Sequence, residues 1–445
     1  MSDTDRPWVI VVGAGPAGLL LSVMLAKLAG IKVQVLEANS KLDVSLRAAY
    51  YGPPAAVELR RAGLLDEIRR EGFQPEIFCW RKLDGSYIAG LDYRKVADNP
   101  DRLFVLPLDQ LGALLYRHAS TTPGVEISFN HKVTEVGQDK DDAWVQVETS
   151  TGLHRLQAKY VVGCDGASST VRRFISEDGG FPGFTWDNQI MTANVRLLRD
   201  PTPFICLNPD FRSWLTWEKI LYPFDKFGYS DVQFIIHSEH WHLLARLSKN
   251  PNPDDDVWRI AYGEISGLTK EELLARQPEK FSVLLPGNPQ PEDYKILSIN
   301  PYKTHQRLVD SMRKGRLLLA ADAAHLCPPF GGLGLTGGIV DVGGLYDCLA
   351  GIYHEKAEES ILDLYSEVRR QKYIDHTDPM TKANLRRLTE LDPDRALEDD
   401  KFLKLLDEIK NNNLEAQKEI LMGDMKLYYD FTQHYKDKTP IVKRA

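Results

Sequence analysis

Two glycine-rich segments, far apart in the chain, have the composition of loops that bind a flat, phosphate-bearing ligand. In the first, VIVVGAGPAGLLLSVML, a short β-branched run precedes Gly13, Gly15 and Gly18 in a GxGxxG pattern, and a helical pattern follows. Gly13 permits a tight turn, Gly15 lets a pyrophosphate approach the backbone, and Gly18 lets the helix pack closely on the sheet. With Ala17 of the same loop and the N–H groups of the helix N-terminus, they predict a dinucleotide site.

An acidic residue follows the next predicted strand. The run 32–36 ends at Glu37, nineteen residues after Gly18. A carboxylate there can accept hydrogen bonds from an adenosine ribose, and it would repel a 2′-phosphate. The alternative, a glycine turn with an unrelated surface acid, requires strand, glycines, helix and acid to share this spacing by coincidence. The first motif by itself leaves NAD and FAD open.

The second segment, LLLAADAAHLCPPFGGLGLTGGI, combines a buried-strand pattern, an acid, two prolines and a nearly bare backbone. Asp322 at the strand end can hold a hydroxyl of an extended cofactor. The two prolines, the second of them Pro329, form a stiff wall. Gly332 and Gly334 allow a flat ring to approach. A helix starting near Leu335 would turn its positive end toward that ring, which suits a reduced, anionic flavin. A nicotinamide cofactor needs no second cradle, whereas FAD does.

A third strand-like run, YVVGCDGASSTVRR, ends in Asp165. Its carboxylate could also face a cofactor, since ligands bind beyond the carboxyl ends of such strands. A strand followed by a turn and an N-capping serine explains the same residues equally well. The residues alone leave both interpretations open.

The three motifs GAGPAG, CDGASSTVRR and AADAAHLCPPFGG, in this order, resemble those of the single-component FAD-dependent aromatic hydroxylases, the group typified by 4-hydroxybenzoate hydroxylase. The resemblance covers the chain from about residue 8 to residue 352. Four further stretches, SLRAAYYGPPAAVELRRAG, FPGFTWDNQ, FIIHSEHWH and YKTHQR, look most like fungal members. Among these, the most similar are 4-hydroxybenzoate 1-hydroxylases, which hydroxylate with loss of the carboxylate.

The resemblance implies bound FAD, with NADH or NADPH as a co-substrate that docks only transiently. It places the adenosine diphosphate part of FAD at the first motif and Glu37, and the ribityl chain at Asp322. It assigns to the cofactor also Arg47 in the SLRA segment and Gln110, which stands in the place of an arginine or glutamine that helps to hold FAD. Asp165 would contact the FAD pyrophosphate and NAD(P)H, and Pro329 would line the face that reacts with O2. The family's Gly-Asp pair is Ala-Asp here, a change that we expect to be tolerated.

The resemblance also implies an α/β fold with interleaved domains. A Rossmann-like FAD/NAD(P)-binding domain would alternate with a mostly antiparallel β-sheet substrate domain, followed by a helical C-terminus that braces the FAD domain or pairs two subunits. The ranges are 8–74, 99–173 and 298–352 for the FAD domain, 75–98 and 174–297 for the substrate domain, and 353–445 for the helical region.

One segment, 196–221, has no clear period and resembles nothing in the family. Three interpretations remain open: a lineage-specific loop over the substrate, a poorly ordered surface excursion, or an intron retained in the gene model.

The expected reaction is hydroxylation of a phenol or hydroxybenzoate, with or without decarboxylation. NAD(P)H would reduce the flavin, O2 would add to give a C4a-hydroperoxyflavin, and one oxygen atom would pass to an electron-rich ring. Such a site must exclude water and remove a phenolic proton. The predicted catalytic residues are Tyr229 or Tyr302 near the phenol, Arg246 as a fork for a substrate carboxylate, and Pro329. For each tyrosine, ordinary packing is the alternative.

Two histidine features have ordinary alternatives. The histidines of HSEHWH lack a Cys, an Asp or a further His to complete a set of ligands, so no metal site is expected. His325, in the second segment, has either a role in proton transfer or a structural hydrogen bond.

Composition excludes several other classes. The net charge is −8 with interspersed signs, which argues against nucleic-acid and anionic-membrane partners. Five scattered cysteines without CxxC spacing, no signal peptide and no apolar run of membrane-spanning length predict a reduced, cytoplasmic enzyme, either monomer or homodimer. Two alternative functions remain: a flavin monooxygenase of fungal secondary metabolism that oxidises an indole alkaloid or polyketide phenol, and a non-catalytic FAD-binding escort protein.

Overall fold

The computed structural model describes residues 6–43, 49–176, 178–197, 224–249, 256–411 and 413–441. Its centre is a six-stranded sheet in the order β17-β18-β11-β1-β2-β7, in which all strands but β17 run parallel. Strands β1, β11 and β18 are buried along their whole length, as expected of a parallel sheet covered on both faces. The strands are β1 (Val9–Val12), β2 (Val33–Leu36), β7 (Val125–Ser128), β11 (Tyr160–Gly163), β17 (Arg313–Lys314) and β18 (Leu317–Leu319).

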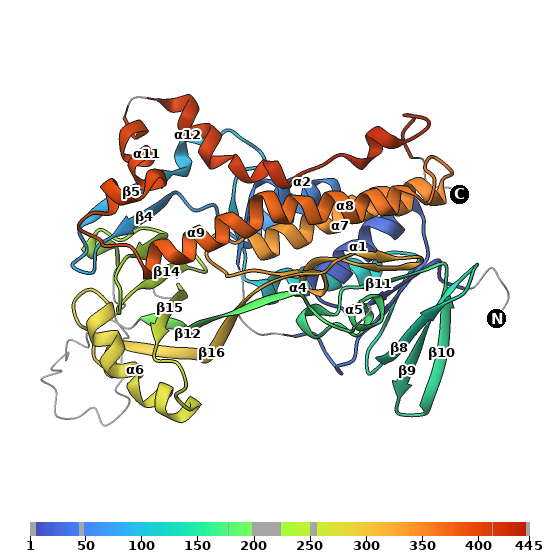
Figure 1. Ribbon diagram of the computed structural model, residues 1–445, viewed down its shortest axis with the longest axis horizontal. Helices are drawn as coiled ribbons and strands as arrows, with labels where there is room; N and C mark the ends of the chain where they lie inside the picture. The colour runs from blue at the N-terminus through green and yellow to red at the C-terminus, as the bar shows by residue number, and fades with distance from the viewer. Residues whose placement is uncertain are drawn as a thin grey trace, which may run out of the picture.

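Helices cover this sheet, and α1 packs between α4 and α7 (Figure 1). Helix α7 is long and apolar enough by composition to cross a membrane, which the sequence analysis did not expect. However, 89% of that stretch is buried inside the protein, as in a core helix. The helices of this part are α1 (Pro16–Ala29), α2 (Pro53–Arg61), α3 (Leu65–Glu71), α4 (Leu108–Thr121), α5 (Thr170–Ile175) and α7 (Leu333–Tyr353).

A buried ionic cluster joins α2 to α7. Arg61 donates to Glu58 at 2.8 Å and to the carboxylate of Asp347. Gly343 makes this packing possible, because a side chain there would occupy the place of the Glu58 carboxyl group. Burial raises the pKa of Glu58 to about 7 and that of Asp347 to about 6, although Arg61 opposes both shifts.

As the pH rises from about 4.5 to about 7, the Glu58 carboxyl group should lower the free energy of unfolding. In that window the folded protein still holds the proton, whereas the unfolded chain has released it, so the free energy of unfolding falls with rising pH. Urea unfolding of wild type and Glu58→Gln across this window measures the effect. The variant should gain stability relative to wild type as the pH rises; a constant difference would contradict this assignment.

The second large sheet has eight strands in the order β19-β16-β12-β15-β14-β13-β4-β5. Every neighbouring pair is antiparallel except β13 with β4, which confirms the mostly antiparallel sheet predicted from the sequence. Its strands are β4 (Ile77–Arg81), β5 (Tyr87–Asp92), β12 (Gly183–Leu197), β13 (Val232–Ile235), β14 (His242–Arg246), β15 (Trp258–Glu264), β16 (Tyr294–Leu308) and β19 (His325–Leu326).

Alternation along these strands gives the sheet two different faces. One face packs on helix α6 (Lys270–Leu284) through residues such as Ala193, Leu244 and Ile260. The other carries Ile190 and Ala261, which pack with Phe330 of the second glycine-rich segment. The sheet therefore turns this second face toward the predicted flavin wall.

The chain ends in helices, as predicted. A π-helical turn over Tyr373–Thr377 joins α8 to α9, and α11 packs on β5. Figure 1 shows α8 beside α7 over the central sheet, with β8, β9 and β10 at one end of the molecule and α6 at the other. The remaining elements are β3 (Tyr50–Tyr51), β6 (Phe104–Val105), β8 (Lys132–Gln138), β9 (Ala143–Thr149), β10 (Gly152–Ala158), α8 (Ile361–Lys372), α9 (Asp378–Thr389), α10 (Ala396–Asp399), α11 (Lys401–Ile409) and α12 (Leu414–Leu421).

Two predictions about organisation stay predictions. The segment 196–221 lies outside the described residues from 198 onward. The domain division also remains an expectation, and its predicted boundary at 297/298 falls inside the 15-residue strand β16. The C-terminal segment does contact α7, because the Tyr435 hydroxyl donates to the carbonyl oxygen of Asp347 at 2.5 Å.

Candidate active site

The first glycine loop lies where its motif predicts, between β1 and α1. Gly13 has φ +101°, and a Cβ there would lie 2.6 Å from the carbonyl oxygen of Cys164. A Cβ on Gly18 would collide with the carbonyl oxygen of Gly13, so helix and loop approach too closely for any side chain. At Gly15, in contrast, no protein atom lies within 4 Å of the position that a Cβ would take. Gly15 begins α1 without a side-chain cap, so the first-turn N–H groups face outward beside it.

The three sequence motifs meet at one edge of the central sheet. Cys164 donates its N–H to Val12 at 2.8 Å, and Ala320 donates to Gly163 at 3.1 Å. Arg172 donates to the carbonyl oxygens of Ala323 at 3.2 Å and Ala167 at 2.8 Å. The motifs follow β1, β11 and β18, which are neighbours in the sheet. This is the edge at which open α/β sheets bind ligands.

Two acids face this edge from the strand ends. Glu37 accepts from the N–H groups of Ala14 and Asn39, both at 2.9 Å, which fixes its carboxylate beside the glycine loop. Asp165 accepts from the N–H of Thr170 at 2.6 Å through one oxygen. Its other oxygen, Oδ1, is buried and has no hydrogen-bond partner among the described residues. Burial raises the pKa of Asp165. Its buried Oδ1 would be stabilised by a hydrogen-bond donor from a ligand or by a bound proton. Ser169 also caps α5, as the alternative interpretation of this motif predicts, and the contact of Asp165 with a cofactor stays a prediction.

The second glycine segment forms a bend with unusual backbone angles. Gly332 has φ +69° and precedes α7, which begins at Leu333, two residues before the predicted Leu335. A Cβ on Gly332 would lie 3.1 Å from the carbonyl oxygen of Tyr50, while one on Gly334 would only touch Cys327 at 3.5 Å. Leu335 is half-buried against the core, and Asp322 and Pro329 both have exposed surface on this bend.

Ala321, which replaces the family's glycine, has the left-handed φ of +57°. That conformation costs an alanine about 1 kcal/mol. Ala321→Gly should therefore raise the free energy of unfolding by up to about 1 kcal/mol, because the relief of strain exceeds the added chain entropy. Ala320, at φ −144°, is the matched control, and Ala320→Gly should lower stability instead. Equal shifts in urea unfolding for both variants would contradict the strain at Ala321.

A buried network holds this bend in place. Asp341 of α7 accepts from the Ala321 N–H at 3.0 Å, and its carboxylate lies 2.7 Å from His325 Nε2 and 2.6 Å from Arg369 Nε. Burial would raise the pKa of Asp341, but the charges of His325 and Arg369 outweigh it and lower the pKa. His325 thus has the structural role that the sequence analysis named as one alternative. Arg369 comes from α8, so the C-terminal region supports the site.

The face of the eight-stranded sheet turned toward this bend carries a half-buried arginine. Arg259 of β15 donates to Asn194 of β12 at 3.0 Å. Burial lowers the pKa of Arg259 to about 10, and the nearby hydroxyls of Tyr50 and Tyr302 and the Asp109 carboxylate oppose that shift. Tyr302 packs with Phe330, and burial followed by the charge of Cys327 raises its pKa. Tyr302 is therefore close both to Arg259 and to the segment of Phe330.

Tyr229 and Arg246 lie on the opposite face, against α6. Tyr229 packs with Phe224, and the Arg81 guanidinium lies 5.0 Å from its ring centroid. Arg246 lies between two carboxylates, 3.6 Å from Asp231 and 3.6 Å from Asp256. The structure therefore does not bring these two predicted residues together with Tyr302 and Pro329.

Two predicted cofactor residues, Arg47 and Gln110, stay predictions. Arg47 lies outside the described residues, in the segment 44–48, and Gln110 is exposed in the first turn of α4. Its neighbour Asp109 has a buried Oδ1 that bonds to no described residue. Ala17 lies in the first turn of α1, half-buried, next to Gly18.

Ring nitrogens of the clustered histidines form hydrogen bonds with nearby backbone groups. His237 Nδ1 accepts from the N–H groups of Glu239 and His240, and His242 Nδ1 lies 2.8 Å from the carbonyl oxygen of His240. Across the described ranges, no three His, Cys, Asp or Glu side chains are grouped to hold a metal ion.

The sequence analysis missed Arg259 and Asn194. A signal was present in WRIAYGEI, where alternation places Trp258 and Ile260 on one face of the strand and Arg259 on the other. An arginine on the face opposite core residues is ordinary in a half-buried strand, so this alternation by itself predicts a polar face and not a binding site.

The residues at the edge of the central sheet fit FAD. Two glycines exclude any side chain beside the pyrophosphate position, Gly15 leaves it open, and Asp165 has a buried oxygen that lacks a donor. The bend at Gly332 and Pro329 offers a second bare surface at the far end of the same edge. This cradle in two parts matches a dinucleotide whose second half is a flat ring system.

Comparison with known proteins agrees with this fit. The sequence model of the family described as FAD binding domain matches residues 6–377. A para-nitrophenol 4-monooxygenase from Pseudomonas sp. (strain WBC-3) is 38% identical over 400 residues, which are 89% of this chain and 91% of the relative. A 6-hydroxy-3-succinoylpyridine 3-monooxygenase from Pseudomonas putida is 31% identical over 382 residues, 85% of this chain and 88% of the relative.

Solved structures agree as well. The crystal structure of p-nitrophenol 4-monooxygenase from Pseudomonas putida has a TM-score of 0.82 at 35% identity, covering 95% of this chain and 98% of the other. Aklavinone-11 hydroxylase, solved with FAD and aklavinone, has a TM-score of 0.70 at 23% identity, covering 88% and 70%, which shows the shared fold. The two relatives compared above are bacterial, so they do not support the predicted closeness to fungal enzymes. The chain belongs to the FAD-binding-domain family and is a flavin-dependent aromatic monooxygenase.

Proposed function

We propose that the protein hydroxylates a para-substituted phenol at the ring carbon that carries the substituent, using O2 and NADH or NADPH, and releases that substituent. The names of the two relatives support this choice. One acts at position 4 of para-nitrophenol, and the other at position 3 of 6-hydroxy-3-succinoylpyridine. In both compounds that carbon lies opposite the hydroxyl group and already carries a substituent. The decarboxylating hydroxylation predicted from the sequence is a reaction of the same kind.

The departing group determines the organic product. Nitrite leaves with the bonding electron pair, so 4-nitrophenol would give benzoquinone, nitrite and water. Carbon dioxide leaves without that pair, so 4-hydroxybenzoate would give hydroquinone, CO2 and water. Each turnover consumes one O2 and one NAD(P)H, and the second oxygen atom becomes water. The flavin would supply the redox chemistry, because it accepts a hydride from NAD(P)H and activates O2.

The residues of this chain would bind and orient the ring. The Arg259 guanidinium would stabilise the phenolate form, which is the electron-rich form that accepts oxygen. Asn194 accepts from Arg259 and would orient it, and Tyr302 packs against the cluster that contains Phe330, the neighbour of Pro329. In this proposal Arg259 takes the anion-binding role that the sequence analysis assigned to Arg246, and Tyr302 is the tyrosine near the phenol.

The observation that carries the proposal is the position of Arg259. Arg259 lies on the same face as Ala261, which packs with Phe330; it donates to Asn194 at 3.0 Å, and burial lowers its pKa to about 10. A protein that keeps such a charge on the face toward its cofactor edge uses it for binding or catalysis. We further propose that the enzyme acts in the cytoplasm, as a monomer or homodimer.

A panel of phenols tests the proposal. The purified, FAD-loaded protein is mixed with NADH or NADPH and with 4-nitrophenol, 4-hydroxybenzoate, 3-nitrophenol or phenol. We expect nitrite from 4-nitrophenol or CO2 from 4-hydroxybenzoate, in a one-to-one ratio to oxidised NAD(P)H. A hydroxylated product that keeps its para substituent would overturn the substituent-releasing reaction and leave only the aromatic monooxygenase.

A further inference from the structure

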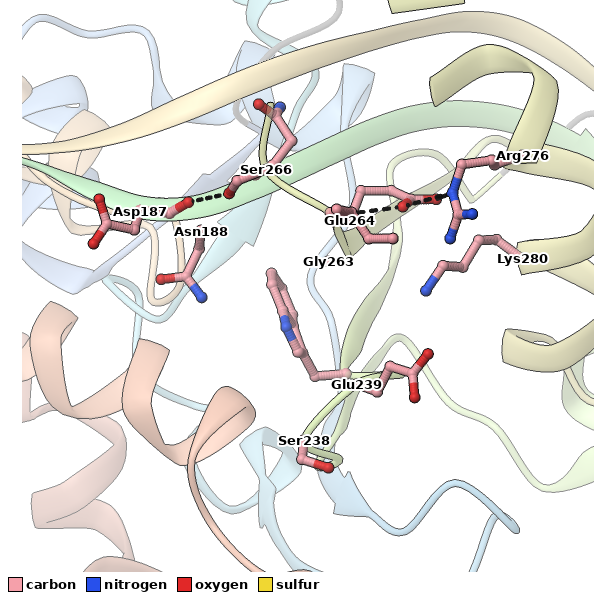
Figure 2. A pocket seen from close by; sticks show the side chains of 12 residues that line it. Asp187, Asn188, Ser238, Glu239, Gly263, Glu264, Ser266, Arg276 and Lys280 are labelled. Carbon is pink, nitrogen blue, oxygen red and sulfur yellow. Dashed lines mark hydrogen bonds and ion pairs between the residues drawn. The ribbon is translucent and has the colours of Figure 1, made fainter. Parts of the chain in front are cut away.

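A pocket of about 350 Å³ lies where the inner strands β12 and β15 of the eight-stranded sheet meet the turn before β14, beside α6. It opens where β12 bulges between Thr185 and Gln189, and its other walls come from the end of β15 and the turn before β14. Figure 2 shows Lys280 and Arg276 on one side of this pocket, with Asp187 on the opposite side. None of the cofactor residues described above lines it.

Trp241 separates this pocket from the flavin wall. Its indole lies flat on the backbone of Gly263, where a Cβ would approach the ring to 2.5 Å. The same indole meets Phe330 edge-on, with the ring centroids 5.8 Å apart. The pocket and the substrate face of the sheet are therefore two different places with one buried side chain between them.

Lys280 is the unusual residue of this pocket. The residue as a whole is 93% buried, and its ammonium makes no hydrogen bond and no ion pair with any described residue. Figure 2 shows that ammonium directed into the pocket, between Glu239 and Arg276. Burial, and then the charge of Lys280, lowers the pKa of His240, which places the lysine close to that ring. An ammonium that meets only the solvent of a pocket, on a side chain otherwise buried, is available to pair with an anion that enters the pocket.

The other charged side chains of the pocket limit the charge of an anion that would pair with Lys280. The Glu264 carboxylate is fully buried and accepts from Arg276 Nε at 3.1 Å, so these two charges satisfy each other. The Glu239 side chain is 74% exposed, and its carboxylate lies 4.0 Å from His240 Nε2. Asp187 also contributes negative charge at the rim, which would repel a dianion such as phosphate. One unmatched cation beside an indole suits a single carboxylate on a small apolar body.

We propose that this pocket binds a small organic monocarboxylate, whose carboxylate pairs with Lys280 and whose apolar part rests against Trp241. The site is separate from the substrate face and does not depend on the proposed reaction.

Calorimetric titration of the FAD-loaded protein with benzoate tests the site, with benzamide as the neutral isostere. Lys280→Met should weaken benzoate binding at least roughly tenfold, since it removes a charge-assisted hydrogen bond. Lys280→Arg should retain binding. Lys270→Met is the matched control, because Lys270 lies exposed on the same helix outside the pocket, and it should bind as wild type does.

The site would be overturned if wild type bound no benzoate at about 10 mM, an affinity weaker than that of nearly all functional small-molecule sites. It would also be overturned if Lys280→Met bound benzoate as tightly as wild type does, or if wild type bound benzamide as tightly as benzoate. Because benzoate could also enter the substrate face, Arg259→Met is titrated in parallel. If Arg259→Met loses benzoate binding and Lys280→Met keeps it, benzoate binds at the substrate face alone, and the proposed pocket site is refuted. If Lys280→Met does not fold, a wild-type crystal soaked in benzoate decides, by carboxylate density beside Lys280 or its absence.

Discussion

Replacing Arg259 with methionine should lower kcat/KM for the phenol substrate by about 100-fold, or about 3 kcal/mol, while the FAD content stays unchanged. The guanidinium lies on the proposed substrate face, and its loss would remove the proposed partner of the phenolate. Because Arg259 also donates to the buried Asn194 at 3.0 Å, the unfolding temperature of the variant is measured beside its kinetics. Steady-state kinetics, flavin absorbance and thermal unfolding of the same preparation measure the three quantities.

Arg246→Met provides the contrast for this variant. Arg246 lies between Asp231 and Asp256 on the opposite face, so its removal leaves two buried carboxylates without their cation. We expect a lower unfolding temperature and a kcat/KM close to that of wild type. The opposite pattern, with activity lost in Arg246→Met and kept in Arg259→Met, would return the anion-binding role to the residue predicted from the sequence.

Gly15→Ala should weaken FAD binding by about 3 kcal/mol, or roughly 100-fold, without preventing folding. A methyl group there meets no protein atom within 4 Å, so the apoprotein accommodates it. The same methyl group occupies the place where the pyrophosphate must approach the backbone. Fluorescence titration of the apoprotein with FAD gives the dissociation constant, and circular dichroism confirms the fold.

Gly18→Ala is the matched control, since it adds the same methyl group three residues later. There the methyl collides with the carbonyl oxygen of Gly13, so the loss should appear as poor folding in the absence of cofactor. If Gly15→Ala bound FAD as tightly as wild type, the pyrophosphate could not lie against this loop.

The cofactor edge could be predicted from the sequence because each of its parts is local. A strand that ends in GxGxxG, or in an acid followed by prolines and glycines, fixes its own backbone shape within a few residues. The parallel sheet then brings β1, β11 and β18 together, as strand patterns of this kind require. For these reasons Gly13, Gly18, Glu37, Asp165 and Gly332 lie at one edge, as predicted.

The substrate face could not be predicted with the same certainty, because a shift of one residue moves a side chain to the other side of a sheet. Arg246 and Arg259 are both arginines on neighbouring strands, and only the pairing of β14 with β15 shows that they point in opposite directions. The support of Ala321 by Asp341 and Arg369 was also invisible, since it joins three segments that are distant in sequence. The strain at Ala321 appears only in its backbone angle.

A crystal structure of the protein with FAD and 4-nitrophenol tests the central claim most directly. We predict the pyrophosphate of FAD beside Gly15, its adenosine ribose beside Glu37 and its ring system beside Pro329 and Gly332. The phenol oxygen should lie within hydrogen-bond distance of Arg259. A phenol bound against the α6 face of the sheet, or FAD bound away from the two glycine segments, would contradict the account.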